Sequence, residues 1–260
     1  MRLNFHRYSE SGKPLLILHG LFGSLGNWGW HSKELSKYYS VIGVDLRNHG
    51  DSPHDKELNY PVMALDVVKL IESLGLSSVA IIGHSMGGKV AMELALQHPQ
   101  FIEKLVVVDI APVAYPDRID SHKGIIDGMK ALNLSEVKNR GEADIFLAPY
   151  IEEEPTRKFI LTNLVHTKEG GYKWRLNLDA IEKNYGNLRE KPTGIGTYES
   201  AILFVKGALS DYIKPENEAE ILDLFPNAQV KIIMQAGHWL HVDKPQAFQK
   251  IVSDFLAEKD

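Results

Sequence analysis

Short apolar segments alternate with longer amphipathic segments along this chain, and the alternation constrains the fold more than any other feature of the sequence. The short segments are nearly continuous in Val, Ile and Leu, which is typical of strands buried on both faces of a parallel sheet. Between them, residues 60–74 and 245–257 place apolar residues three and four positions apart, which predicts helices with one buried face. The predicted strands are residues 14–20, 40–45, 78–84, 104–110, 201–207 and 228–234. We therefore predict an α/β fold with a mostly parallel central sheet covered by helices.

The composition excludes several classes of protein. A net charge of −5 over 260 residues gives no basic excess for binding nucleic acid. The absence of cysteine excludes disulfides, cysteine-bound zinc and a thiol nucleophile. The N-terminus lacks the pattern of a secretory signal, and no apolar run reaches the roughly 18 residues of a membrane helix. We expect a cytoplasmic protein, a monomer or homodimer, with no nucleic acid partner and no membrane insertion.

Residues 112–195 interrupt the alternation. Polar and charged residues dominate this segment, and it contains no pattern of a buried strand, so we predict that it is helical. It leaves from the C-terminal end of a strand, where open α/β sheets bind ligands. We predict a core domain of residues 1–111 and 196–260, with residues 112–195 inserted between two strands as a helical cap. The alternative is a small helical domain that takes no part in the chemistry.

A glycine-flanked serine stands where one predicted strand gives way to a helix. The segment "VAIIGHSMGGKVAMELA" places Gly83-x-Ser85-x-Gly87 at this junction, which fits the strand–turn–helix of a nucleophile elbow. Glycines on both sides remove the Cβ atoms that a tight turn cannot hold. The turn would raise the Ser85 hydroxyl above the strand ends, so we predict that Ser85 is a nucleophile.

A serine hydroxyl needs a base, and "QAGHWLHVDKP" supplies His238 between the last strand and the last helix. His241 follows three residues later, and we expect it to have a structural role. A metal site at this pair is the alternative, but no third ligand motif accompanies it. We predict no metal.

An acyl-transfer site also needs backbone N–H groups that bind the oxyanion of the tetrahedral intermediate. Met86, directly after the predicted nucleophile, supplies one. The segment "LHGLFGS" follows an early strand, and the amide of Leu21, or less favourably that of Phe22, supplies the second.

Together these segments resemble the α/β-hydrolase superfamily over nearly the whole chain. More narrowly, "HGLFGSLGNW", "VDLRNHGDSPH", "YPVMALDV", "GHSMGGKVAM" and "VVVDIAPVAY" are similar to the YbfF-type bacterial esterases. The resemblance implies hydrolysis of esters or thioesters through an acyl-enzyme on Ser85, without a metal or organic cofactor. It also implies fatty-acyl thioesters such as acyl-CoA as substrates.

The acid of a Ser-His-Asp triad has two candidates. The superfamily usually places it in a G-x-x-D turn after the next-to-last strand, but here Ser210 occupies that position and Asp211 comes one residue late. Asp109 ends the strand that follows the elbow helix, also at the C-terminal edge of the sheet. We favour Asp109, because the triad depends on geometry rather than on sequence position, and we expect Ser210 to help hold the histidine.

Other residues carry weaker expectations. Phe22 and Trp239, with Leu21 and Met86, are candidates for an acyl pocket, although each is also compatible with the core. Arg47 and Asn48 lie in a turn-rich loop that we interpret as scaffold. The cations of the insertion are candidates for contacting the phosphates of CoA, although scattered surface cations are the simpler interpretation. These cations are Lys123, Arg140, Arg157 and Lys158.

The rival functions are of two kinds. Enzymes with the same machinery include carbon–carbon bond hydrolases, cofactor-free haloperoxidase-type enzymes and methyl esterases of carrier-linked acids. A hydrolase fold that acts as a ligand receptor is the rival of another class. A receptor would still bind its ligand after Ser85 is replaced by Ala, whereas an enzyme would lose turnover after the same change.

Overall fold

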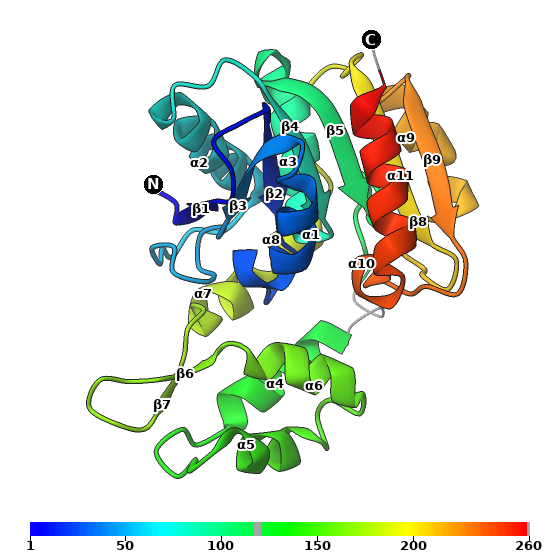
Figure 1. Cartoon of the computed structure of the whole chain (residues 1–260). Helices are drawn as coiled ribbons and strands as arrows, with labels where there is room; N and C mark the ends of the chain where they lie inside the picture. The colour runs from blue at the N-terminus through cyan, green and yellow to red at the C-terminus, as the bar shows by residue number, and fades with distance from the viewer. Residues whose placement is uncertain (117–120, 259–260) are drawn as a thin grey trace.

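The computed structural model, which describes residues 1–116 and 121–258, is built on a seven-stranded sheet in the order β1-β3-β2-β4-β5-β8-β9 (Figure 1). Every neighbouring pair is parallel except β1 and β3. The strands are β1 (Phe5–Arg7), β2 (Lys13–Leu18), β3 (Tyr39–Val44), β4 (Val79–His84), β5 (Ile102–Val108), β8 (Ala201–Gly207) and β9 (Ala228–Ile233). All six predicted strands are confirmed, and β1, with only three residues, was not predicted.

Helices cover both faces of the sheet. α1 (Gly29–Leu35) and α11 (Pro245–Ala257) pack on one face, and α2 (Tyr60–Ser73), α3 (Met86–Gln97) and α9 (Glu218–Leu224) pack on the other (Figure 1). The helices predicted from apolar spacing are therefore present as α2 and α11. Four shorter turns of helix complete this part of the chain, at Leu25–Trp28, Pro99–Phe101, Pro215–Asn217 and α10 (Leu240–Asp243).

The central strands explain why their sequence is so uniformly apolar. In β2, Leu15 and Ile17 join the cluster under α1 and α11, whereas Leu16 and Leu18 join the cluster under α2 and α3. Successive side chains of a strand point to opposite faces, so a strand with helices on both faces buries every residue.

The prediction of burial on both faces is wrong for β9. This strand lies at the edge of the sheet, and Val230 and Ile232 remain 49% and 55% exposed. At the edge of the sheet, the helices on the two faces leave most side chains of β9 uncovered, and only the strand order decides which strand lies at the edge.

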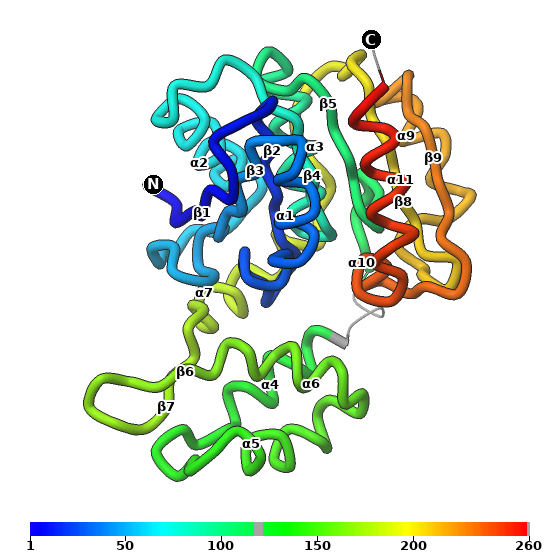
Figure 2. Tube along the Cα trace, viewed as in Figure 1, coloured from blue at the N-terminus to red at the C-terminus, as the bar shows by residue number. Residues whose placement is uncertain are grey.

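The segment inserted between β5 and β8 lies below the edge of the sheet at which the parallel strands end (Figures 1 and 2). It contains α4 (Ser121–Ala131), α5 (Arg140–Leu147), α6 (Glu154–Leu161), α7 (Leu178–Lys183) and α8 (Tyr185–Arg189). It also contains an antiparallel hairpin of β6 (Leu164–His166) and β7 (Tyr172–Trp174), so the prediction of an entirely helical segment is wrong there. Residues 117–120 of the predicted cap and residues 259–260 of the predicted core lie outside the described residues.

Across residues 1–116 and 121–258, none of the helices has both the length and the apolar character needed to cross a membrane.

Candidate active site

The turn between β4 and α3 holds Ser85 in a strained backbone conformation. Its φ of 50° and ψ of −116° lie where residues with a side chain are rarely found. A Cβ on Gly83 would lie 2.4 Å from the carbonyl oxygen of Gly87, and a Cβ on Gly87 would lie 2.5 Å from that of Leu18. Both glycines are therefore required for the turn, and the strand–turn–helix geometry expected of an elbow is present.

Asp109 and His238 meet at the same edge of the sheet. Asp109 directly follows β5, is fully buried, and its Oδ2 lies 2.8 Å from Nδ1 of His238. Its other oxygen accepts a hydrogen bond from the amide of Gly207 at 2.9 Å, and the hydroxyl of Ser210 donates to Oδ2. The side chain of Asp211 is exposed. A carboxylate only accepts, so Nδ1 of His238 carries the proton and Nε2 is left as the basic nitrogen.

The backbone of His238 is also fixed. The Nε2 of His84 donates to the carbonyl oxygen of His238 at 3.0 Å, and the two rings lie 4.8 Å apart. Burial holds the pKa of His84 well below its usual range, with a further contribution from His241. A neutral His84 thus links the elbow to the loop that carries His238.

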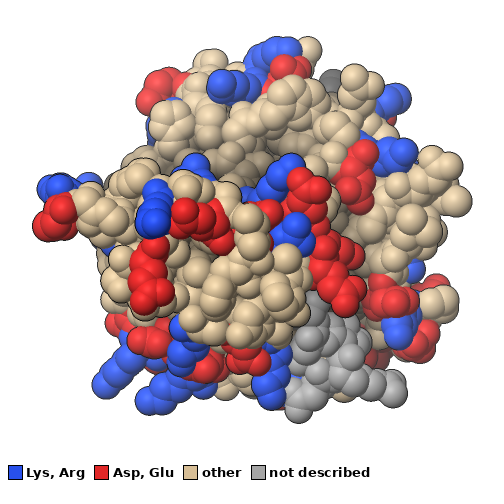
Figure 3. Space-filling view, turned by 90° about the horizontal axis from the view of Figure 1, so that it is seen from below, with Lys and Arg blue, Asp and Glu red and all other residues tan. Residues whose placement is uncertain are grey.

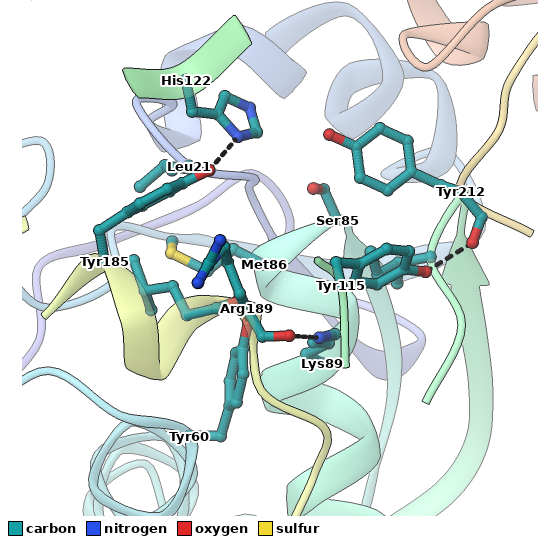
Figure 4. Close-up of a pocket in the computed structure, with 12 residues that line it drawn as sticks. Leu21, Tyr60, Ser85, Met86, Lys89, Tyr115, His122, Tyr185, Arg189 and Tyr212 are labelled. Carbon is teal, nitrogen blue, oxygen red and sulfur yellow. Dashed lines mark hydrogen bonds between the residues drawn. The ribbon is translucent and has the colours of Figure 1, made fainter. Parts of the chain in front are cut away.

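A small cavity of about 50 Å³ lies beside Ser85 (Figure 4). It is formed by the elbow, the loop after β2, the loop after β8 and both ends of the insertion. Its lining residues are Leu21, Tyr60, Ser85, Met86, Lys89, Ile110, Tyr115, His122, Tyr185, Leu188, Arg189 and Tyr212.

The two predicted oxyanion residues, Leu21 and Met86, line this cavity with Ser85. The loop that carries Leu21 is fixed by His19, whose Nε2 accepts from the amide of Leu46 at 3.0 Å. Nδ1 of His19 must then be the donor, and it lies 2.8 Å from the carbonyl oxygen of Gly20. Burial lowers the pKa of His19, which keeps the ring neutral for this arrangement.

Phe22 and Trp239 do not line the cavity. Phe22 is 2% exposed, and its ring meets the ring of His122 in a T-shaped contact with centroids 5.8 Å apart. The ring of Trp239 packs on Phe159 of α6 with centroids 5.0 Å apart. A contact of either residue with substrate remains a prediction. Phe22 thus contacts His122, which lines the cavity, without lining the cavity itself.

Sequence reasoning missed most of the polar lining. Tyr60 and Tyr115 bring hydroxyl groups, and burial raises the pKa of both, which keeps them protonated. Nδ1 of His122 lies 3.1 Å from the hydroxyl of Tyr185, and burial lowers the pKa of His122 to about 4. Tyr115 lies within a quoted motif and Tyr212 follows Ser210 by two residues, but nothing local shows that they converge.

Lys89 is the clearest omission, because it is a buried cation one turn after Ser85 in an otherwise apolar part of α3. Its Nζ donates to the carbonyl oxygens of Val113 at 2.8 Å and of Arg189 at 3.1 Å, and to that of Glu190. Burial lowers the pKa of Lys89 to about 7, while its three carbonyl partners favour the protonated amine. These acceptors belong to the two ends of the insertion, so Lys89 joins both ends to the elbow helix.

The loop of Arg47 and Asn48 has the contacts of a scaffold. Nε of Arg47 lies 2.6 Å from Oδ2 of buried Asp66, and Oδ1 of Asn48 accepts from the amide of Asp55 at 2.8 Å. His241 is likewise structural, since it is buried and its ring stacks on Trp28 with centroids 4.3 Å apart.

Three of the four candidate cations have partners within the insertion. Arg157 pairs with Asp144 at 2.9 Å, Lys158 pairs with Glu154, and Arg140 donates to a backbone carbonyl group. Lys123 is exposed. Basic and acidic side chains are interspersed over this face (Figure 3). Among the described residues of the insertion, the four candidate cations therefore form no continuous basic patch that could bind the phosphates of CoA. Within residues 1–116 and 121–258, no three His, Asp or Glu side chains are grouped to hold a metal ion.

A mostly parallel sheet with a strained serine after β4, an aspartate after β5 and a histidine after β9 is the arrangement of the α/β hydrolases. A family model described as the alpha/beta hydrolase fold matches residues 13–245, and the chain belongs to this family.

Relatives of this chain include esterases and lipases. The chain is 42% identical to the sn-1-specific diacylglycerol lipase ABHD11 of Mus musculus, over 94% of this chain and 80% of that protein. It is 34% identical to esterase YbfF of Escherichia coli, over 98% and 99% of the two chains, which confirms the resemblance. A solved marine microorganism esterase is 43% identical, with a TM-score of 0.96 over 98% of this chain and 99% of that one. These relationships support a hydrolase that acts on ester bonds.

Proposed function

We propose that this chain is a serine hydrolase that cleaves small acyl esters or thioesters through an acyl-enzyme on Ser85. The observation that carries the proposal is the 2.8 Å contact between Asp109 and Nδ1 of His238 at the edge of the sheet where the strained Ser85 stands. The esterase and lipase relatives support the same class of reaction.

In the first step, Nε2 of His238 takes the proton of the Ser85 hydroxyl as the oxygen attacks the acyl carbon. Asp109 fixes the tautomer of His238 and stabilises the imidazolium that forms. The amides of Leu21 and Met86 bind the oxyanion, a role in which a single donor is worth about 10²–10³ in rate. The imidazolium then protonates the leaving alcohol or thiol as the tetrahedral intermediate collapses to the acyl-enzyme.

In the second step, water attacks the acyl-enzyme and gives its proton to Nε2 of His238. The acid is released, and the proton returns to the oxygen of Ser85. Apart from the attacking water, the groups that act in both steps are side chains and amides of this chain.

The size of the cavity bears on the substrate. About 50 Å³ gives room for a few water molecules, and therefore for a short acyl group. We propose that residues 112–195 act as a cap, because both ends of this segment line the cavity, and that they set the upper limit on acyl length.

The test is hydrolysis of acyl chains from two to sixteen carbons, presented as nitrophenyl esters and as CoA thioesters, by wild type and by Ser85→Ala. We expect short esters to be cleaved fastest and Ser85→Ala to lose turnover. Turnover of neither series by wild type, or an unchanged rate in Ser85→Ala, would contradict the proposal. A preference for thioesters over matched esters would assign the finer activity.

A further inference from the structure

The ring of Tyr212 covers one face of His238. The two ring centroids are 3.9 Å apart and the ring planes differ by 24°. The Tyr212 hydroxyl and the Ser85 hydroxyl point into the same space (Figure 4). Tyr212 is therefore stacked directly on His238, the predicted base.

The loop that carries Tyr212 is the one that also holds Asp109. The amide of Tyr212 donates to the hydroxyl of Ser210 at 3.3 Å, and that hydroxyl in turn donates to Asp109. One short turn thus contacts both members of the Asp109–His238 pair. Ser210 donates a hydrogen bond to the carboxylate, and Tyr212 stacks on the imidazole.

Tyr115 fixes this turn from the insertion. Its hydroxyl donates to the carbonyl oxygen of Tyr212 at 2.5 Å (Figure 4). The same hydroxyl accepts from the amide of Ala111 at 2.9 Å. Burial raises the pKa of Tyr115, so the hydroxyl remains a donor at every working pH. This bond restrains the backbone of Tyr212, whose ring stacks on His238.

The position of Tyr115 is set in turn by the junction of the two ends of the insertion. Its amide donates to the carbonyl oxygen of Arg189 at 2.9 Å, and the Nζ of Lys89 lies 4.7 Å above its ring. A continuous series of contacts therefore leads from the elbow helix through the ends of the insertion to the face of His238.

We propose that Tyr212 is a positioning residue for His238, and that Tyr115 holds Tyr212 in place. The inference rests on the proposed function. A stacked ring prevents the imidazole from turning out of the plane in which Nδ1 meets Asp109. Its aromatic face also stabilises the imidazolium more than the neutral ring, because the face of an aromatic ring attracts a cation. The second effect favours the transition state, in which the imidazolium forms, over the resting enzyme, and the first keeps the imidazole in the orientation that the proton transfer needs.

The test compares Tyr212→Phe, which keeps the ring, with Tyr212→Leu, which removes it. We expect kcat on a short nitrophenyl ester to fall about tenfold in Tyr212→Leu and to fall clearly less in Tyr212→Phe, which keeps the stacked ring and loses only the hydroxyl, with a smaller change in KM. Tyr115→Phe keeps its own ring and loses the hydroxyl that donates to Tyr212 and accepts from the amide of Ala111, so we expect an intermediate loss of kcat. Thermal unfolding of each variant establishes that it is folded.

A second readout does not need turnover. In Ser85→Ala, the Nδ1 proton shared with Asp109 should give a downfield proton resonance, assigned to His238 by ¹⁵N labelling. We expect it to persist when Tyr212→Phe is added and to broaden by exchange with water when Tyr212→Leu or Tyr115→Phe is added.

An undiminished kcat in Tyr212→Leu together with an unbroadened resonance would overturn the proposal, as would an equal loss of kcat in Tyr212→Phe and Tyr212→Leu. If wild type cleaves no ester, the proposed function fails, while the resonance still decides whether Tyr212 holds His238. If Tyr212→Leu does not fold, Tyr115→Phe gives the answer through both readouts.

Discussion

Replacing Asp109 by Asn tests the proposed triad most directly, because the change keeps the size of the side chain and alters only charge and hydrogen bonding. Asp109 is fully buried and its two oxygens meet the amide of Gly207, the hydroxyl of Ser210 and Nδ1 of His238. An Asn that keeps the bond from Gly207 with its oxygen turns its NH₂ toward His238. Nδ1 must then accept, and the proton moves to Nε2, the nitrogen that has to receive the proton of Ser85.

The expected loss follows from this wrong tautomer and from the missing countercharge for the imidazolium. A change of this kind costs about 10⁴-fold in kcat, which is about 5 kcal/mol of transition-state stabilisation at 1.36 kcal/mol per factor of ten. The assay is kcat on a short nitrophenyl ester, with the reactive fraction of Ser85 counted by a fluorophosphonate probe. Asp211→Asn is the matched control, since this aspartate directly follows Ser210 in the chain and its side chain is exposed. We expect it to retain kcat within about twofold.

A loss of less than tenfold in folded Asp109→Asn would refute the assignment of the acid. So would an equally large loss in Asp211→Asn, because the choice between the two aspartates rests on the contact with His238 alone.

Three further predictions concern stability. Burial lowers the pKa of His241 to about 3, whereas in the unfolded chain this histidine binds a proton below about pH 6.5. Because the unfolded state then binds one proton more than the folded state, His241 should lower the free energy of unfolding by up to about 1.4 kcal/mol per pH unit as the pH falls to 4. Urea denaturation should show this share of the slope missing in His241→Phe, and an unchanged slope would contradict it. Asp66→Asn leaves the buried guanidinium of Arg47 without the Asp66 carboxylate and should lower the free energy of unfolding by about 3–5 kcal/mol. A loss below about 1 kcal/mol would mean that the ion pair of Arg47 and Asp66 is dispensable for stability. Gly87→Ala forces a Cβ to 2.5 Å from a backbone oxygen of β2, which cannot move away as a side chain would. We expect the free energy of unfolding to fall by about 1–3 kcal/mol and kcat to fall as well. A variant with wild-type stability and rate would show that the turn adjusts to the added methyl group.

The sequence alone predicted the elements and the elbow because their signals are local. Apolar period separates strands from helices, and Gly83 and Gly87 mark a turn that no larger residue could form. The same local signals failed for β9, whose residues read as a central strand although the strand lies at the edge. They also failed for the hairpin of β6 and β7, whose three-residue strands are too short to show an alternation.

Only the tertiary structure decided which distant residues meet. The order of strands places the end of β5 beside the end of β8, and this brings Asp109 against Ser210 and His238 rather than leaving Asp211 as the partner. The ring of Tyr212 on His238, and the bond from Tyr115 that holds it, depend on the same arrangement. Tyr212 and His238 lie in different loops, and the hydrogen-bonded pairs are 97 to 129 positions apart in the sequence. No periodicity predicts these contacts, because the local pattern of a chain fixes the period of each element but not its neighbours.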